Sequence, residues 1–371
     1  MASDGVPAGR SRGLDVMRGA AVAFLLVITF TPGTGWNEHA NWWGWRAADA
    51  FFPAFLLVAG VGLGYQTGRA VPWSRLLRRF ALLILVGLVL NAVLGAGTDL
   101  GRLRIPGVLQ RIAVVGLLGA AFVAVTRRRY EAAVAGAVGV ALVWAVVVWL
   151  AASSCPGHRP TPAGCGTLFD LDEAVFGHAH LYRDGGQGHD PEGLASTLGA
   201  LATFLAGFGA GAALVARPAE PLIRRVRPVV VMAAGWLAVT PVFLAFQPVG
   251  KRMWTASLVS VTAAGGLALL VGAMALFDAE WRHRWARRSV QVVAWPLEAL
   301  GRNALLLYVA LTVLEHALVT TGIGRDHQPT ADWFVAHIGP AGYLVIFGGG
   351  LVLVACGLRA RGWGLAAVRA G

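Results

Sequence analysis

The chain has 371 residues, of which 57% are hydrophobic and only 13% are charged, whereas soluble globular domains carry about 25% charged residues. A mean hydropathy of +0.64 excludes an ordinary soluble fold and indicates a chain that crosses the membrane several times. The formal net charge of +12 would suggest nucleic-acid binding in a soluble protein, but here arginines gather in short loops, as the positive-inside rule predicts. We therefore expect the lipid bilayer, and no nucleic acid, as a partner.

Ten apolar runs approach the length of about 20 residues that a membrane-spanning helix needs. They cover residues 16–33, 47–66, 79–96, 106–126, 132–152, 193–216, 229–247, 255–277, 296–320 and 340–358. These runs predict an all-α polytopic membrane protein of about ten transmembrane helices, in a single domain covering residues 1–371. The first run could be a signal peptide, but it ends in TPGTG without a small-x-small cleavage pattern, which favours a true span.

Lysine and arginine divide unevenly between the two sets of loops. Segments on the N-terminal side of the membrane hold 21 of the 31 basic residues, those on the other side hold eight, and Arg111 and Arg302 lie within spans. This bias predicts that both termini are cytoplasmic. The long loop 153–192 and residues 36–45 are then extracytoplasmic, and we expect the protein in the plasma membrane.

Two of the three cysteines, Cys155 and Cys165, lie in that long outer loop. An oxidising compartment permits a disulfide between them, while Cys356 lies in the last run and is expected to act as a small apolar residue.

The stretch WNEHANWWGW, residues 36–45, places one histidine among four tryptophans between two apolar runs. Tryptophan is typical of the membrane–water interface, so the stretch could be only an anchor. However, His39 has two carboxylates nearby, Glu38 and Asp49, that could orient its imidazole for proton transfer near neutral pH. The aromatic faces of Trp42 and Trp43 could also stack against sugar rings.

Three further segments put polar groups inside or beside the apolar runs. In RLRIPGVLQRI, residues 102–112, Gln110 and Arg111 fall within the fourth run, where a charge usually faces a partner or a cavity. In EALGRNALLLY, residues 298–308, Glu298 and Arg302 are four residues apart and can form a structural ion pair. Lys251, the only lysine, could bind an anion or simply solvate a turn.

Histidines and aspartates of the outer loop offer weaker signals. His180 and Asp184 have an H-x-x-x-D spacing, which we interpret as a coincidence because four residues of spacing are not specific. A metal site is conceivable from His178, His180, His189 and Asp190, but the glycines between them and the lack of paired cysteines argue against one. We expect no metal.

Several longer motifs resemble those of the heparan-α-glucosaminide N-acetyltransferase family and its bacterial relatives, within the wider transmembrane acyltransferases. They run nearly from end to end of the chain. They are GLDVMRGAAVA (13–23), HANWWGWRAADAFFPAF (39–55), RIPGVLQRI (104–112), DPEGLASTLGA (190–200), KRMWTASLV (251–259) and LGRNALLLY (300–308).

The resemblance implies about ten or eleven helices around a passage and an acetyl transfer from cytosolic acetyl-CoA to an amino sugar on the far side. The catalytic residues would be His39, as base or transient acetyl carrier, with Glu38 and Asp49. Cofactor-binding candidates are Arg104, Gln110, Arg111, Lys251, Trp254, Arg302 and Asn303. Substrate-binding candidates are Trp42, Trp43, His180, Asp190 and Glu192.

The chain departs from the family pattern near the expected site. Phe30 and Trp43 stand where the family has asparagines, and Glu173 stands where arginine is common, which predicts a shifted acceptor preference. Two alternatives remain: a sugar or anion transporter or binding protein without chemistry, and an O-acyltransferase of surface glycans. Small residues in the spans permit a homodimer without requiring one.

Overall fold

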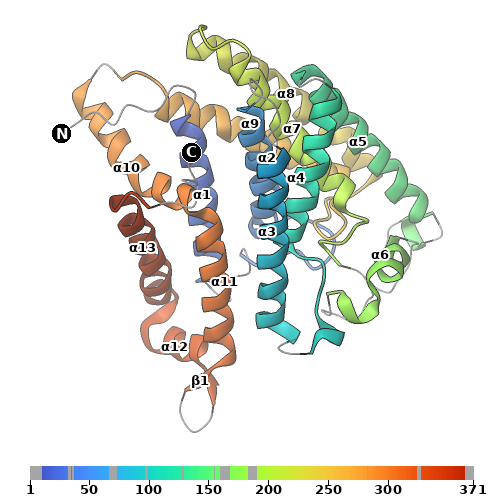
Figure 1. The fold of residues 1–371 in the computed structure, drawn as a ribbon, viewed down its shortest axis with the longest axis vertical. Helices are drawn as coiled ribbons and strands as arrows, with labels where there is room; N and C mark the ends of the chain where they lie inside the picture. The colour runs from blue at the N-terminus through green and yellow to red at the C-terminus, as the bar shows by residue number, and fades with distance from the viewer. Residues whose placement is uncertain are drawn as a thin grey trace. The chain divides into compact units, whose positions relative to one another are not determined.

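The computed structural model describes residues 11–31, 35, 37–66, 73–96, 99–126, 129–153, 155–158, 168–182, 190–281, 283–323 and 327–363. These residues are overwhelmingly helical (Figure 1). The α-helices are α1 (Arg12–Thr29), α2 (Phe51–Gly64), α3 (Trp73–Asn91), α4 (Val108–Val125), α5 (Tyr130–Ala151), α6 (Leu168–Phe176), α7 (Thr197–Val215), α8 (Leu222–Phe246), α9 (Ala256–Phe277), α10 (Arg284–Arg302), α11 (Ala304–Thr320), α12 (Thr330–Tyr343) and α13 (Gly349–Ala360).

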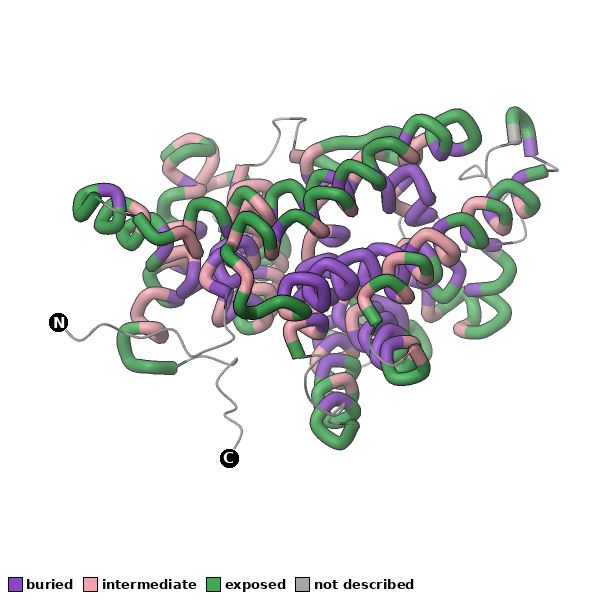
Figure 2. Tube along the Cα trace, turned by 90° about the horizontal axis from the view of Figure 1, so that it is seen from above, coloured by how far each residue is buried: buried purple, intermediate pink, exposed green. Residues whose placement is uncertain are grey.

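The predicted all-α polytopic membrane fold is confirmed. Within the described residues, eight helices are long and apolar enough to cross a membrane, or nine if a bent pair is one span. Helix α1 matches the first predicted run but carries Arg12, Asp15 and Arg18 near its start. The outward sides of many helices are exposed and apolar, as lipid-facing surfaces should be (Figure 2).

The ninth predicted span, 296–320, is not a single helix. Helices α10 and α11 meet at Asn303 with a bend of 75°. The Asn303 backbone leaves the helical region, and its Nδ2 donates to the carbonyl oxygen of Ala299 at 3.0 Å. A side-chain amide that satisfies a backbone group lets the chain break inside an apolar segment. The hydropathy pattern, which the bend leaves unchanged, could not indicate this break.

The described chain divides into two compact units. One contains residues up to His39, Arg46–Phe51 and Gly272 onward; the other contains Ala40–Trp45 and Phe52–Val271. The first is the N/C unit and the second is the central unit.

Helix α7 forms the core of the central unit, and nearly all of its residues are buried. Its glycines permit close contact with α2: a Cβ on Gly207 would lie 2.1 Å from the carbonyl oxygen of Leu57, and one on Gly211 would lie 2.2 Å from that of Val61. Small residues allow helix backbones to approach in this way within membranes. Helix α7 begins at Thr197, within the DPEGLASTLGA motif of residues 190–200.

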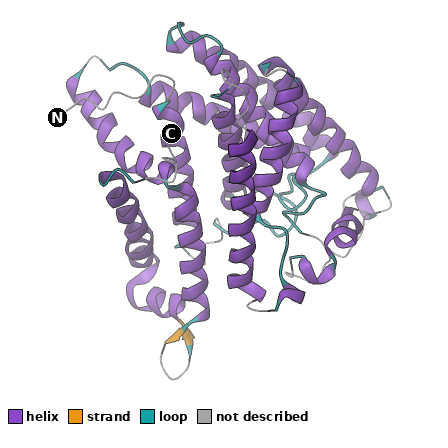
Figure 3. Ribbon diagram, viewed as in Figure 1, coloured by secondary structure: helices purple, strands orange, loops and turns teal. Residues whose placement is uncertain are grey.

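In the N/C unit, α1 packs closely on α10. A Cβ on Gly19 would clash with the carbonyl oxygen of Leu297. The Asp278 carboxylate accepts hydrogen bonds from the Ser11 hydroxyl and the Arg12 amide at the start of α1. Strands β1 (Gly322–Ile323) and β2 (Gln328–Pro329) pair antiparallel between α11 and α12, with Gly322 opposite Pro329 (Figure 3).

Glu298 has two partners from other helices. Its two carboxylate oxygens accept from the guanidinium groups of Arg12 on α1 and Arg359 on α13. The ion pair with Arg302, four residues further along α10, stays a prediction. The tertiary contacts could not be predicted from the spacing along α10.

Candidate functional site

His39 is held by a buried carboxylate. Its Nδ1 lies 2.9 Å from Oδ1 of Asp49, and the Asp49 side chain is fully buried while that of His39 is 55% exposed. The other oxygen of Asp49 accepts from the Arg46 backbone amide at 2.9 Å. A histidine bound through Nδ1 to a carboxylate presents Nε2 outward, and the carboxylate fixes both the ring orientation and the tautomer.

Glu38, the second predicted carboxylate, points to a different partner. Its Oε2 accepts from the Arg46 guanidinium at 2.8 Å, and both side chains are substantially exposed. Asp49 is therefore the carboxylate that contacts His39. The contact arises because a 3₁₀ turn, Ala47–Ala50, begins after Arg46 and brings Asp49 back toward the preceding segment.

Trp42 and Trp43 pack within the central unit. Trp42 is only 6% exposed and belongs to a buried cluster with Trp144 and Met253. The Arg252 guanidinium lies 5.4 Å from the Trp42 ring centre. Trp43 is half-buried, and its ring leaves no room for a Cβ at Gly250, which would lie 2.7 Å away.

An ion cluster in the central unit gathers four of the predicted residues. Arg104 binds Asp190 with two hydrogen bonds of 2.8 and 2.6 Å and Glu192 with one of 2.6 Å. Its guanidinium also lies 4.7 Å from the centre of the Tyr182 ring. Lys251 contributes positive charge that acts on Glu192. Bidentate hydrogen bonds between an arginine and a carboxylate are strong and require a specific geometry.

The pKa values of this cluster follow from its charges. Burial alone would raise the pKa of Glu192, but Arg104, Arg111 and Lys251 more than offset this and lower it. Burial acts to lower the pKa of Arg104, and its bonds to Asp190 and the charge of Glu192 raise it instead. Both groups therefore stay charged near neutral pH.

Arg111 and Gln110 are buried on α4. The Nη2 of Arg111 donates to the carbonyl oxygen of Gly193 at 2.8 Å and to the Ser196 hydroxyl, and its guanidinium lies 5.3 Å from the Trp254 ring centre. Gln110 lies against Gly87 of α3. The motifs at 104–112, 190–200 and 251–259 thus meet in one region of the central unit.

The other predicted residues lie at element ends. His180 Nδ1 donates to the carbonyl oxygen of Leu103 at 2.7 Å, which links the 153–192 loop to the segment before α4. Arg302 is half-buried and Asn303 is buried, at the break between α10 and α11. Cys155 is disulfide-bonded, and its predicted partner Cys165 lies outside the described residues, as do Asp184 and His189.

Sequence reasoning missed Asp172 of α6. Its carboxylate is 2% exposed and accepts from the amides of Leu194 and Ala195 at 2.7 and 3.2 Å, just before α7. Burial raises its pKa more than these bonds lower it. One acidic residue in a loop helix carries no local signal of such a contact, because the partners lie 22 and 23 residues away.

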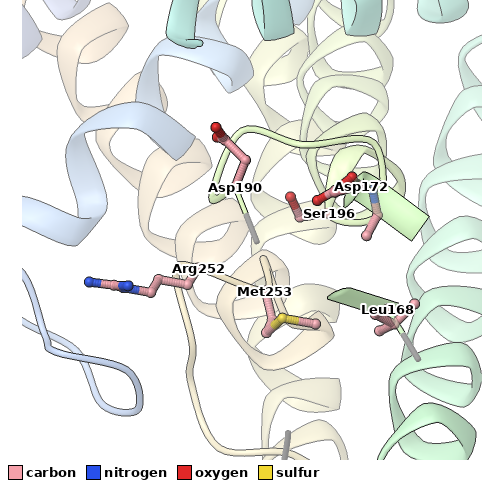
Figure 4. A pocket seen from close by; sticks show the side chains of 7 residues that line it. Leu168, Asp172, Asp190, Ser196, Arg252 and Met253 are labelled. Carbon is pink, nitrogen blue, oxygen red and sulfur yellow. Dashed lines mark hydrogen bonds between the residues drawn. The ribbon is translucent and has the colours of Figure 1, made fainter. Parts of the chain in front are cut away.

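Asp172 also lines a small cavity of about 10 Å³ with Asp190, Ser196 and Arg252 (Figure 4). That volume suits about one water molecule. In Figure 4 the Arg252 guanidinium points away from the two aspartates. No group of three or more His, Cys, Asp or Glu side chains suited to a metal occurs among the described residues.

Comparison with known proteins agrees with the motifs. Residues 10–155 match the sequence model of a family described as "Heparan-alpha-glucosaminide N-acetyltransferase, catalytic". This chain resembles that family. The human protein named heparan-alpha-glucosaminide N-acetyltransferase is 24% identical to it over 385 aligned positions, which cover 89% of this chain. The chain spans 57% of the length of that human relative. The resemblance predicted from the motifs is thereby confirmed.

Proposed function

We propose that the protein is a transmembrane acetyltransferase that moves an acetyl group from cytosolic acetyl-CoA to an amino sugar of the glucosamine type on the extracytoplasmic side. The observation that carries this proposal is the His39–Asp49 pair, in which an exposed imidazole is bound by a fully buried carboxylate. The similarity of residues 10–155 to the catalytic family described above supports the reaction class.

The acceptor amine, the thioester and His39 each have one role in the proposed reaction. The acceptor amine attacks the thioester carbon, so a C–N bond forms, the C–S bond breaks and CoA leaves as the thiolate. His39 Nε2 takes the proton that the amine loses, and the protonated imidazole can return it to the thiolate. A positioned base contributes roughly 10²–10⁴-fold to such a reaction. In the alternative route His39 first attacks the thioester and carries the acetyl group as acetyl-imidazole before the amine takes it.

Asp49 serves as the positioning residue in both routes. It holds the proton on Nδ1 through the 2.9 Å contact, and it stabilises the imidazolium that forms when Nε2 gains a proton. Its burial favours this role, because an electrostatic contact is stronger where water is excluded. Glu38, paired with Arg46, contributes local charge balance.

The predicted donor-binding and acceptor-binding residues remain part of the proposal. Polar or aromatic contacts to acetyl-CoA are assigned to Arg104, Gln110, Arg111, Lys251, Trp254, Arg302 and Asn303. Trp42, Trp43, His180, Asp190 and Glu192 are assigned to the acceptor. The half-buried Trp43 ring, packed on Gly250, is the side chain that we expect to shape acceptor choice.

The test offers labelled acetyl-CoA and a panel of amino sugars to the purified protein in vesicles. We expect label to appear on an amino sugar, in the amide. Label on a sugar hydroxyl would replace this proposal with O-acylation of glycans. CoA-independent sugar flux without labelled product would contradict the proposal and favour a transporter. Rapid quenching before acceptor is added distinguishes the two routes, since only the carrier route labels His39.

A further inference from the structure

Arg111 is a buried cation with donors that lack partners. Its side chain is 2% exposed, and only Nη2 is engaged in a hydrogen bond, to Gly193 and Ser196. Nε and Nη1 are buried without an acceptor among the described residues. A buried donor without an acceptor destabilises the folded protein, and more so when the donor is charged. An oxygen acceptor supplied by a ligand would remove this destabilisation.

The ring that packs against Arg111 belongs to Trp254, a residue with a strained backbone. Trp254, whose ring faces the guanidinium, has a left-handed φ of +49°. Its conformation is maintained by Trp144 Nε1, which donates to the carbonyl oxygens of Met253 and Trp254, and by its own Nε1, which donates to Thr203. Non-glycine residues held in this region concentrate at functional sites, where the surrounding structure overcomes the strain.

The charges around Arg111 indicate whether its ligand is an anion or a neutral group. Asp172, Asp190 and Glu192 are the carboxylates that act on Arg111. Arg104 and Arg111 together with Lys251, which acts on Glu192, supply an equal number of positive charges. Because these carboxylates already balance the charge of Arg111, its guanidinium gains little from a further anion. It suits a neutral oxygen that gains negative charge only during a reaction.

We propose that Arg111 donates to the carbonyl oxygen of the donor's acetyl group, through Nε or Nη1. This inference rests on the proposed acetyl transfer. The carbonyl is neutral in acetyl-CoA and becomes an oxyanion as the amine attacks and the C–O double bond opens. The oxyanion then expels the CoA thiolate, and the carbonyl of the amide product is restored. Removing one donor of this kind typically lowers kcat by 10²–10³-fold.

The experiment compares binding of acetyl-CoA and of CoA, which lacks the acetyl carbonyl, to wild-type protein and to Arg111→Lys. Lysine keeps the positive charge. Its single ammonium group cannot reproduce the N–H donors that the planar guanidinium holds in fixed directions. The wild type should bind acetyl-CoA roughly tenfold or more tightly than CoA, as expected for a hydrogen bond to a charged group. Arg111→Lys should bind both equally and transfer acetyl at least about 100-fold more slowly.

Arg225→Lys is the matched control, because Arg225 Nε also donates to a backbone carbonyl, that of Leu214, in the same unit. Its discrimination between the two ligands should be that of the wild type. Thermal unfolding checks that Arg111→Lys is folded, and Arg111→Gln gives a second variant if it is not.

Several results would overturn the inference. One is a wild type that binds CoA and acetyl-CoA equally. Another is a folded Arg111→Lys that keeps the discrimination and the rate, since Arg111 would then be a structural residue solvated by water. If the wild type discriminates through Arg111 but transfers no acetyl group, the carbonyl site stands and only the proposed reaction fails.

Discussion

The His39–Asp49 pair and the Arg104 cluster use buried carboxylates in opposite ways. Asp49 is buried, but its histidine partner is 55% exposed, so one end of the pair stays accessible for proton transfer. In the Arg104 cluster, cations and carboxylates are both largely buried and paired with one another. A buried carboxylate thus binds an exposed imidazole in the first region and a guanidinium within an ion network in the second.

The largest expected effect of breaking the first region comes from Asp49→Asn. The amide cannot hold the Nδ1 proton as a carboxylate does, so the ring loses its fixed orientation and tautomer. We expect the acetyl transfer rate to fall on the order of 10²-fold or more, with little change in acetyl-CoA binding. Glu38→Gln distinguishes the two carboxylates, because the contacts predict a rate close to wild type. Equal losses in both variants would contradict the assignment to Asp49.

In the second region, Arg104→Met should act on stability instead. It leaves Asp190 and Glu192 without their main cation, and breaking a buried pair costs about 3–5 kcal/mol. A pronounced fall in the apparent melting temperature in detergent measures this. An unchanged melting temperature would mean that the cluster carries no net stability and that its charges serve only binding.

The two carboxylates Glu192 and Asp172, both in the segment 153–192, should give opposite pH dependences. The lowered pKa of Glu192 means that its contribution to stability is complete above its ordinary pKa and is lost as pH falls through the lower folded value. The raised pKa of Asp172 means that its ionisation weakens the fold, so its contribution improves as pH falls.

Melting temperatures followed between roughly pH 3 and 6 should therefore separate two variants. Glu192→Gln should reduce the fall in melting temperature at acid pH, and Asp172→Asn should increase that fall. Identical pH profiles for both would refute the opposite signs.

The smallest effect is expected from Trp43→Asn, which restores the amide of the family pattern. The ring packs on Gly250, so its removal should reshape the surface of the central unit at this point and change acceptor preference about tenfold. Trp45→Asn, at a ring that is 42% exposed, is the matched control. An unchanged acceptor profile would leave Trp43 as an interface residue.

Hydropathy and motifs predicted much of this molecule because the membrane imposes helices of a known length. All ten predicted runs correspond to helices, including α1 and the bent pair, within the described residues. The break at Asn303 was missed because a 75° bend leaves the apolar pattern intact. The choice between Glu38 and Asp49, the contact of Glu298 with Arg359 and the hydrogen bonds of Asp172 all depend on tertiary contacts that spacing alone does not determine.

The central claim is that His39 performs the transfer, and its most direct test is the rate of labelled acetyl transfer by His39→Ala. Because the His39 side chain is 55% exposed, the variant should fold and bind acetyl-CoA like the wild type. Its transfer rate should fall by at least about 100-fold, while His337→Ala, an exposed histidine elsewhere, should match the wild type. Wild-type turnover in folded His39→Ala would contradict the account.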